Sequence, residues 1–248
     1  MKALIVMALL AAAPMQAADP LHFSSGPSRV ALIELYTSEG CSSCPPADQW
    51  LGELKDKPGL WKEYVPVEFH VNYWDGLGWK DRLSSRAFTS REYAYASAWG
   101  SRSVYTPCFV RNGSEWRPLW GGPGAGAAGQ SGLLSVDMTG DGSCRVLFTP
   151  EGAPDDRAAY TVHVALLGGG ISSKVTAGEN GGETLRHEFV VIGLEEKLLS
   201  AEAAGGPVGA TVTIPKPAVT DTKRRALAAW VTRGDELVPL QATGGWLP

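Results

Sequence analysis

The sequence predicts an α/β domain followed by a β-rich region, which we interpret as an antiparallel, sandwich-like arrangement of short strands. Up to residue 113, strand-like and helix-like segments alternate, which is typical of α/β domains. A glycine-rich stretch, GGPGAGAAGQSG, then interrupts the pattern and indicates a linker. Beyond it, short apolar runs are separated by turn signals and show no helical periodicity. We therefore place the α/β domain at 27–122, the linker at 123–132 and the β-rich domain at 133–248.

In the α/β domain, branched apolar residues predict buried strands, and apolar residues at helical spacing predict helices. A capping box of Thr89 and Glu92 predicts the start of the second helix, and Gly100 predicts its end. The first two strands are expected to be parallel. In chain order we expect strand 30–36, helix 45–57, strand 64–71, helix 88–100, strand 108–111 and a hairpin turn at Asn112-Gly113.

The β-rich domain contains runs with the length and composition of short strands. These runs are LLSVDM, CRVLFT, YTVHVALL, LRHEFVVI, GATVTI and ALAAWVT. The segment GLEEKLL is predicted to be a surface turn or a short helix. His163 and His187 lie in strand-like runs without cysteine or acidic partners at ligand spacing, which favours structural roles for both.

The N-terminus predicts export. Lys2 precedes a short apolar run, and Ala17 and Ala18 suit cleavage, so we assign residues 1–18 to a signal peptide. The run is too short to span a bilayer, although an uncleaved anchor stays an alternative. We expect a periplasmic or secreted protein, without a stable membrane span after cleavage, in a compartment where disulfides persist.

The charge composition argues against a nucleic-acid partner. The 248 residues include 22 basic and 26 acidic side chains, a formal net charge of −4, and no basic cluster offers a phosphate-binding face. A hydrophobic content of 44% is ordinary for a globular protein of this length. The chain can therefore bury a core without needing disulfides merely to fold.

Two of the four cysteines form the motif Cys41-Ser42-Ser43-Cys44, between a predicted strand and a predicted helix. The spacing allows a disulfide across one turn, and it allows one thiolate to attack while the other resolves. Free N–H groups at a helix N-terminus stabilise such a thiolate. Pro45 and Pro46 move the expected start of regular helix to about Pro45, which weakens this effect at Cys41. By itself the motif leaves open a working dithiol, a metal clamp and a passive crosslink.

Three blocks of the chain, IELYTSEGCSSCPPAD, FHVNYWDGLGWKD and VYTPCFVRNG, resemble the secreted thioredoxin-like family known as DUF1223, a domain of unknown function. The similarity runs from about residue 30 to residue 113, and the order and length of the blocks make it specific. The resemblance implies that 27–122 is a thioredoxin-like domain and that the protein is exported. It implies no particular substrate.

The resemblance also implies roles for individual residues. Cys41 would be the exposed attacking thiol and Cys44 the resolving one. Pro107 would be a cis-proline packed against the dithiol, and Thr106 would offer its backbone to an extended substrate. Glu34 is an approximate counterpart of the buried carboxylate of thioredoxin-like proteins. Gly40 and the pair Ser42-Ser43 depart from the thioredoxin pattern, so no redox potential follows.

A third group of residues follows the second predicted strand, at the sheet edge where the dithiol is expected. Tyr73 and Trp74 are candidate substrate contacts, and His70 and Asp75 are candidate supporting residues, with Asn72 between them. His70 could move protons, or it could join Cys41 and Cys44 in a Cu(I) site. The alternative is that the aromatic side chains pack under a loop and His70 has a structural role.

The two remaining cysteines, Cys108 and Cys144, are expected to form a structural disulfide between the two domains. Four cysteines allow three pairings, and this is the simplest one beside a Cys41–Cys44 bond. Two alternatives stay open: both are buried free thiols, or Cys108 is a third redox thiol.

These patterns predict an exported thiol–disulfide oxidoreductase that needs no cofactor. Its partners would be protein thiols or disulfides, or a redox partner in the cell envelope. One alternative is a non-enzymatic binding module with a structural Cys41–Cys44 disulfide. The other is a Cu(I)-binding or Cu(I)-delivery protein that uses Cys41, Cys44 and His70.

Overall fold

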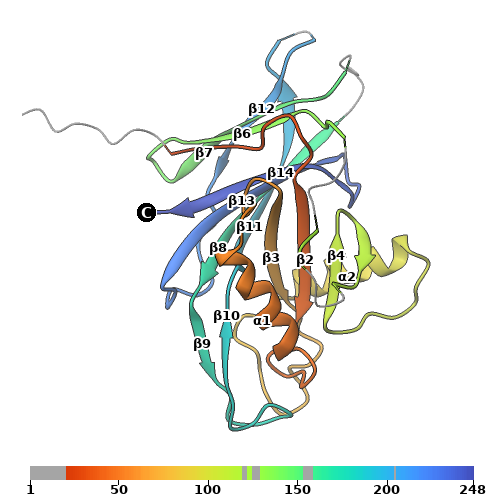
Figure 1. Ribbon diagram of the computed structural model, residues 1–248, viewed down its shortest axis with the longest axis vertical. Coiled ribbons are helices and arrows are strands. Elements are labelled where there is room, and N and C mark those ends of the chain that lie inside the picture. The colour runs from red at the N-terminus through yellow and green to blue at the C-terminus, as the bar shows by residue number, and fades with distance from the viewer. Residues whose placement is uncertain (1–20, 119–121, 125–128, 153–158, 204) are drawn as a thin grey trace, which may run out of the picture.

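The computed structural model describes residues 21–118, 122–124, 129–152, 159–203 and 205–248 (Figure 1). The predicted signal peptide lies outside the described residues, as do residues 125–128 of the predicted linker. Within the described part of the chain, no helix is both long and apolar enough to cross a bilayer. The helices there are α1 (Pro45–Glu53), the short 3₁₀ helix η1 (Leu54–Asp56) and α2 (Arg86–Ala98).

The described residues also form 14 strands. Two of them, β9 (Ile171–Lys174) and β10 (Thr184–His187), make a separate antiparallel hairpin. The other strands make one mixed sheet of 12. They are β1 (His22–Ser24), β2 (Ala31–Thr37), β3 (Tyr64–His70), β4 (Cys108–Arg111), β5 (Ser114–Trp116), β6 (Leu133–Met138), β7 (Ser143–Thr149), β8 (Tyr160–Gly169), β11 (Val190–Ala201), β12 (Val208–Thr213), β13 (Arg224–Arg233) and β14 (Pro239–Leu247).

The predicted fold class, an α/β thioredoxin-like domain followed by a sandwich-like region, is wrong. Of the described residues, 44% are in strands and 12% in helices, with two α-helices and one large mixed sheet among them. The physical reason lies at β3, which pairs with β2 on one side and with β11 on the other. Val190 pairs with Glu68, and the Glu68 N–H donates to the Phe189 carbonyl at 2.9 Å. The sheet therefore continues from the first half of the chain into the second.

Strand β11 is the element that joins the halves. It pairs antiparallel with β8 from Val190 to Leu199, and its end pairs antiparallel with β12 at Ser200 and Ala201. Strand β8 in turn pairs with β13, and β13 pairs with β14. In Figure 1, β6, β7 and β12 lie across the top of the molecule, above the long strands that surround β11.

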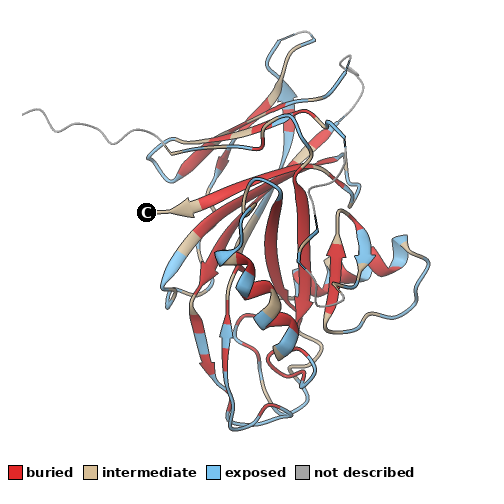
Figure 2. Ribbon diagram, viewed as in Figure 1, coloured by how far each residue is buried: buried red, intermediate tan, exposed pale blue. Residues whose placement is uncertain are grey.

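Two core clusters hold these layers together, and Figure 2 shows β8, β13 and β14 buried along most of their length. One cluster packs α1 and α2 against the sheet and contains residues of both halves, such as Leu32, Phe69 and Trp230. The other fills the space between β6–β7 and β8–β13, with Phe148 and Val164 among its members. Because full burial of one large apolar side chain contributes about 1.5–3 kcal/mol, both clusters contribute strongly to stability.

The strands that position the cysteine motif agree with the sequence prediction. Strands β2 and β3 are parallel, with pairs running from Ala31–Tyr64 to Thr37–His70. Both strands therefore end at one edge, where the CxxC segment follows β2. The predicted hairpin turn after β4 is also present, with φ of 51° at Asn112 and 84° at Gly113.

The predicted start of α2 is wrong. Ser85 is the N-cap, and its side chain accepts a hydrogen bond from the Ala87 N–H at 3.2 Å. Thr89 lies inside the helix and donates to the Asn72 side-chain oxygen at 2.8 Å instead. The predicted end is confirmed, because Gly100 follows the C-cap with a φ of 74°.

The predicted strand LRHEFVVI is two strands, because Phe189 adopts a φ of 59° that an extended run cannot accommodate. Strand β10 ends at His187, and β11 begins at Val190. The prediction for GLEEKLL is also wrong, since this segment pairs with β8 as part of β11. The break at Phe189 separates His187 from β11, and the His187 side chain lies in the interior beside β3.

Candidate functional site

Cys41 and Cys44 form a disulfide at the start of α1, with their Cα atoms 5.5 Å apart. Cys44 is the N-cap of α1, and its N–H donates to the Cys41 carbonyl at 3.2 Å in a tight turn. The helix begins at Pro45, as the prolines predicted. Cys41 therefore lies one turn before the helical N–H groups, and the helix dipole acts more directly on Cys44.

Cys41 is buried, with 1% of its surface exposed, which corrects the expectation of an exposed attacking thiol. Its sulfur lies 3.8 Å from the Thr106 carbonyl oxygen, and the Thr106-Pro107 peptide bond is cis, as expected. The Trp74 indole N–H donates to the Thr106 hydroxyl at 2.8 Å. Trp74 also packs closely on Gly40, where an added Cβ would lie 3.0 Å from the Trp74 Cβ. The predicted substrate contacts Thr106, Pro107 and Trp74 are therefore gathered at Cys41.

The loop of the β9–β10 hairpin covers the cysteine turn from the other half of the chain. Figure 1 shows this hairpin reaching the lower end of the molecule, beside α1. The Asn180 side-chain amide donates to the Glu39 carbonyl at 2.9 Å and to the Cys41 carbonyl at 3.0 Å. Glu179 accepts from the Ser42 N–H at 3.0 Å and from its hydroxyl at 2.7 Å. The loop thereby fixes the backbone of the motif.

Behind the cysteine turn lie six buried titratable residues, which we call the acid–histidine cluster. His70 is at its centre: its Nδ1 lies 2.6 Å from Asp81 Oδ2, and its Nε2 lies 2.8 Å from Glu68 Oε1. Asp81 is itself held by the N–H groups of Glu39 and Leu83, each at 2.9 Å. The members of the cluster are Glu39, Asp48, Glu68, His70, Asp81 and His187.

His187 completes the cluster from the end of β10. Its Nδ1 lies 2.9 Å from Glu68 Oε1 and 3.9 Å from Asp48 Oδ2, while its Nε2 lies 3.6 Å from Glu39 Oε1. The two imidazole rings meet edge to face, with centroids 4.8 Å apart. The cluster therefore joins β3, β10 and α1 in one interior polar network.

The neighbouring charges set the protonation states in this cluster. Burial alone opposes ionisation of Asp81, but the adjacent His70 holds the pKa of Asp81 at about 2. Burial likewise opposes charge on His187, but hydrogen bonding to Glu39 and Glu68 raises its pKa to about 9. Burial and the Glu68 carboxylate raise the pKa of Asp48 to about 7. Burial also opposes charge on His70, but Asp81 and Glu68 raise its pKa well above the usual range. At neutral pH both histidines are therefore cationic.

One protein-family model matches the chain over most of its length. Residues 32–232 match the family described as protein of unknown function (DUF1223). The chain belongs to the DUF1223 family. The predicted DUF1223 membership is therefore confirmed, whereas the thioredoxin-like part of the prediction is not shown. The family description assigns no activity. The comparison with curated proteins gives no significant match.

Two solved structures resemble the DUF1223 chain. Protein AGR_C_4864 from Agrobacterium tumefaciens is 25% identical, with a TM-score of 0.59 over 89% of this chain and 94% of that one. HBP35 of Porphyromonas gingivalis is 14% identical, with a TM-score of 0.58 over 89% of this chain and 76% of that one. The second likeness concerns the fold alone.

Three other predicted site residues make contacts with the scaffold of the DUF1223 chain. Glu34 is buried and accepts from Arg91 Nε at 2.8 Å and from the Tyr95 hydroxyl at 2.5 Å, so it ties β2 to α2. Asp75 accepts from the Ser84 hydroxyl at 3.0 Å and thereby shapes the loop before α2. Tyr73 is half-buried, and burial raises the pKa of its phenol. The sequence predicted Glu34 to support the dithiol, but its contacts are with Arg91 and Tyr95 of α2.

The predicted Cys108–Cys144 disulfide is not formed. Both residues are buried free thiols, and they belong to two different core clusters. Burial raises the pKa of Cys108 to about 12 and that of Cys144 to about 11. Both thiols therefore stay protonated at neutral pH and are poor nucleophiles.

The predicted three-ligand copper site is also replaced by a different arrangement. Within the described part of the chain, the histidine, cysteine and carboxylate atoms close enough to share an ion belong to Glu68, His70 and His187. His70 thus faces two carboxylates, and both sulfurs are in a disulfide. Two cysteines and a histidine suggested copper. The group of ligand atoms around His70 contains Glu68 and His187 and neither cysteine sulfur.

Sequence reasoning missed most of the acid–histidine cluster. Glu68 and His187 are 119 residues apart, so no local spacing relates them. The one available signal was polarity inside an apolar strand, because Glu68 lies between Val67 and Phe69 in β3. A charged residue in a strand with both faces buried needs a partner, and His187 supplies it.

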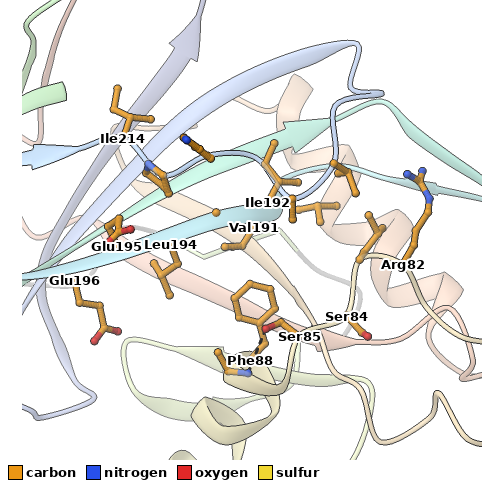
Figure 3. A pocket seen from close by; sticks show the side chains of 18 of the residues that line it. Arg82, Ser84, Ser85, Phe88, Val191, Ile192, Leu194, Glu195, Glu196 and Ile214 are labelled. Atoms are coloured by element: carbon orange, nitrogen blue, oxygen red, sulfur yellow. Dashed lines mark hydrogen bonds between the residues drawn. The ribbon is translucent and has the colours of Figure 1, made fainter. Parts of the chain in front are cut away.

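A separate groove of about 810 Å³ lies between the start of α2 and β11 (Figure 3). Phe88, Ile192, Leu194 and Ile214 give it apolar walls. Of the described residues that line this groove, none is a member of the cysteine motif or of the acid–histidine cluster. The groove is therefore distinct from the cysteine site.

Proposed function

We propose that this DUF1223 protein is a thiol–disulfide oxidoreductase whose reacting groups are Cys41 and Cys44. The observation that carries the proposal is the position of the disulfide. It lies at the start of α1, with the Cys41 sulfur 3.8 Å from the Thr106 carbonyl in the cis Thr106-Pro107 segment. A CxxC pair at a helix start can cycle between dithiol and disulfide across one turn.

The exchange proceeds in two displacements. In the reduced protein, the Cys41 thiolate attacks a substrate disulfide, forms a mixed disulfide and releases one substrate thiolate, which takes the proton of Cys44. The Cys44 thiolate then attacks the Cys41 sulfur and forms the Cys41–Cys44 bond, and the second substrate thiolate leaves and takes a proton from water. Two electrons pass from the dithiol to the substrate disulfide, and the reverse sequence oxidises substrate thiols.

The residues around Cys41 determine how a substrate could reach its sulfur. The sulfur is flanked by Thr106 and by the segment around Gly40, and Trp74 contacts both. Trp74 is only half-buried, so its indole can leave more easily than a core side chain. A substrate peptide that took the place of this indole would lie along the Thr106 carbonyl, whose oxygen can accept a backbone hydrogen bond.

Trapping the mixed disulfide tests this proposal. We expect the Cys44→Ser variant, incubated with oxidised glutathione or insulin, to accumulate a stable adduct at Cys41 that intact-mass analysis detects. Cys41→Ser should accumulate no such adduct, because the sulfur at the Thr106 carbonyl, where the substrate would lie, is that of Cys41. Cys108→Ser is the matched control and should behave as the wild type, since the Cys108 thiol is buried and protonated. Absence of an adduct in folded Cys44→Ser would refute the proposal.

A second candidate function is a non-enzymatic binding module with a structural Cys41–Cys44 disulfide. The burial of Cys41 and the two hydrogen bonds from Asn180 to the motif favour it, because both restrain the cysteine turn. Such a bond would exchange slowly with any thiol, and the trapping experiment separates the two candidates.

We further propose that the protein works in the periplasm or outside the cell, after removal of residues 1–18. Lys2 and the apolar run that follows it support export, and the unreactive Cys108 and Cys144 leave one dithiol for chemistry. The proposed partners are envelope proteins that carry accessible thiols or disulfides.

A further inference from the structure

The acid–histidine cluster contains more buried ligand atoms than its hydrogen bonds satisfy. Among the described residues, Glu68 Oε2 has no hydrogen-bond partner, while His187 Nε2 and Glu39 Oε1 face each other as an ion pair at 3.6 Å. All three side chains are fully buried. An unsatisfied polar atom in the interior destabilises the fold, and does so more strongly when the group is charged. The unsatisfied oxygen of Glu68, whose other oxygen contacts both histidines, points to a missing ligand.

The positions of the ligand atoms suit a small metal ion. One atom each from Glu68, His70 and His187 lie within 4.8 Å of one another. Ligands about 2.1 Å from a tetrahedral ion lie about 3.4 Å apart, so modest side-chain rotations would close the site. Asp48 Oδ2, 3.9 Å from His187 Nδ1, provides a fourth atom at a similar separation.

Both histidines also have the outer partner that metal-bound imidazoles need. Asp81 accepts from His70 Nδ1 at 2.6 Å, which leaves Nε2 toward Glu68. Glu39 lies 3.6 Å from His187 Nε2, which leaves Nδ1 toward Glu68. A carboxylate on the far nitrogen fixes the tautomer and orientation of a metal-ligating histidine. The same arrangement occurs twice around one central carboxylate.

We propose that the cluster is a structural site for one divalent transition-metal ion of the Zn²⁺ class. Glu68, His70 Nε2 and His187 Nδ1 are the ligands, and Asp48 is the fourth. Imidazole and carboxylate donors are the set that Zn²⁺ and similar ions accept. The entering ion displaces the two protons that now join Glu68 to the imidazoles, and these protons pass to solvent. With four protein ligands from β3, β10 and α1, the site is closed and does not depend on the proposed dithiol function.

Refolding with cobalt tests this site, because Co²⁺ reports its ligands by visible absorption. The intact chain, with its disulfide preserved, is unfolded in guanidinium and refolded with Co²⁺ or Zn²⁺. We expect one ion per chain after gel filtration, absorption bands of tetrahedral Co²⁺ without a thiolate charge-transfer band, and a higher unfolding midpoint. His187→Gln should bind at least 100-fold more weakly, and Asp81→Asn should bind 10- to 100-fold more weakly.

His163→Gln is the matched control. His163, on β8, is also a buried histidine. Its Nδ1 lies 3.0 Å from Glu196 Oε1 and its Nε2 lies 3.1 Å from the Thr232 hydroxyl, and neither partner belongs to the acid–histidine cluster. Its substitution should leave cobalt binding unchanged. The proposal fails if the refolded wild type retains no metal, or if Asp81→Asn and His187→Gln bind as tightly as the wild type. If His187→Gln does not refold, the tenfold or greater loss in Asp81→Asn decides the question alone.

Discussion

At the scale of single residues, the same carboxyl group behaves differently according to what faces it. Asp81 faces His70, and its pKa is about 2. Glu92, on α2, is 3% exposed, and within the described residues neither carboxyl oxygen has a hydrogen-bond partner. Burial raises the pKa of Glu92 to about 7. Glu92 therefore prefers to be protonated in the folded protein.

This shift predicts a pH-dependent effect of Glu92→Gln. The pKa is higher in the folded chain than in the unfolded chain, so the stability linked to the bound proton is present below about pH 4.5. It is lost as the pH rises through about 7. We expect the variant to match the wild type near pH 5 and to exceed its unfolding free energy by up to about 3 kcal/mol at pH 8. Urea unfolding at both pH values measures this.

The control is Glu63→Gln, a change at an exposed glutamate. Such a substitution should alter the unfolding free energy by less than about 0.5 kcal/mol at either pH. An equal gain at pH 5 and pH 8 for Glu92→Gln would contradict the account, because the gain would then not come from the buried charge.

The cysteines show what residue-level reasoning can and cannot decide. The spacing of Cys41 and Cys44 fixes a short loop, and the structure contains that disulfide. The pairing of Cys108 with Cys144 required that two distant Cα atoms approach within about 7 Å. No sequence feature reports such a distance, and the two thiols lie in separate cores.

At the scale of elements, strands were easier to predict than the boundaries of helices. The runs of β2 and β3 were found because both faces of these strands are buried, which makes most of their residues apolar. The start of α2 was misplaced because Ser85 and Thr89 are both good caps, and the choice depends on Thr89 bonding Asn72. Strand β10 was merged with β11 because a positive φ at Phe189 has no sequence signature.

The candidate site divides in the same way. The cysteine motif, Thr106-Pro107 and Trp74 lie at loop positions that follow predicted elements, so their meeting could be predicted. Asn180 and His187 come from a hairpin whose docking on α1 depends on tertiary contacts alone. Elements that are distant in the chain therefore supplied the part of the site that sequence reasoning missed.

At the scale of the whole molecule, the two predicted domains share one sheet. Strand β11 pairs with β3, and a single core cluster includes Phe69 and Phe189. Because the core cluster around α1 and α2 has buried members from both segments, we expect one cooperative unfolding transition. Calorimetry should give equal calorimetric and van't Hoff enthalpies. Two separated transitions would instead support independent domains at 27–122 and 133–248.

The central claim is that the Cys41–Cys44 disulfide exchanges with other thiols, and its reduction potential tests this most directly. The intact protein is equilibrated with glutathione buffers of known ratio, and the dithiol fraction is measured by alkylation and mass spectrometry. The account predicts a potential above about −300 mV, where exchange with envelope thiols and disulfides is reversible. A potential well below about −300 mV would contradict it and would assign the bond a purely structural role.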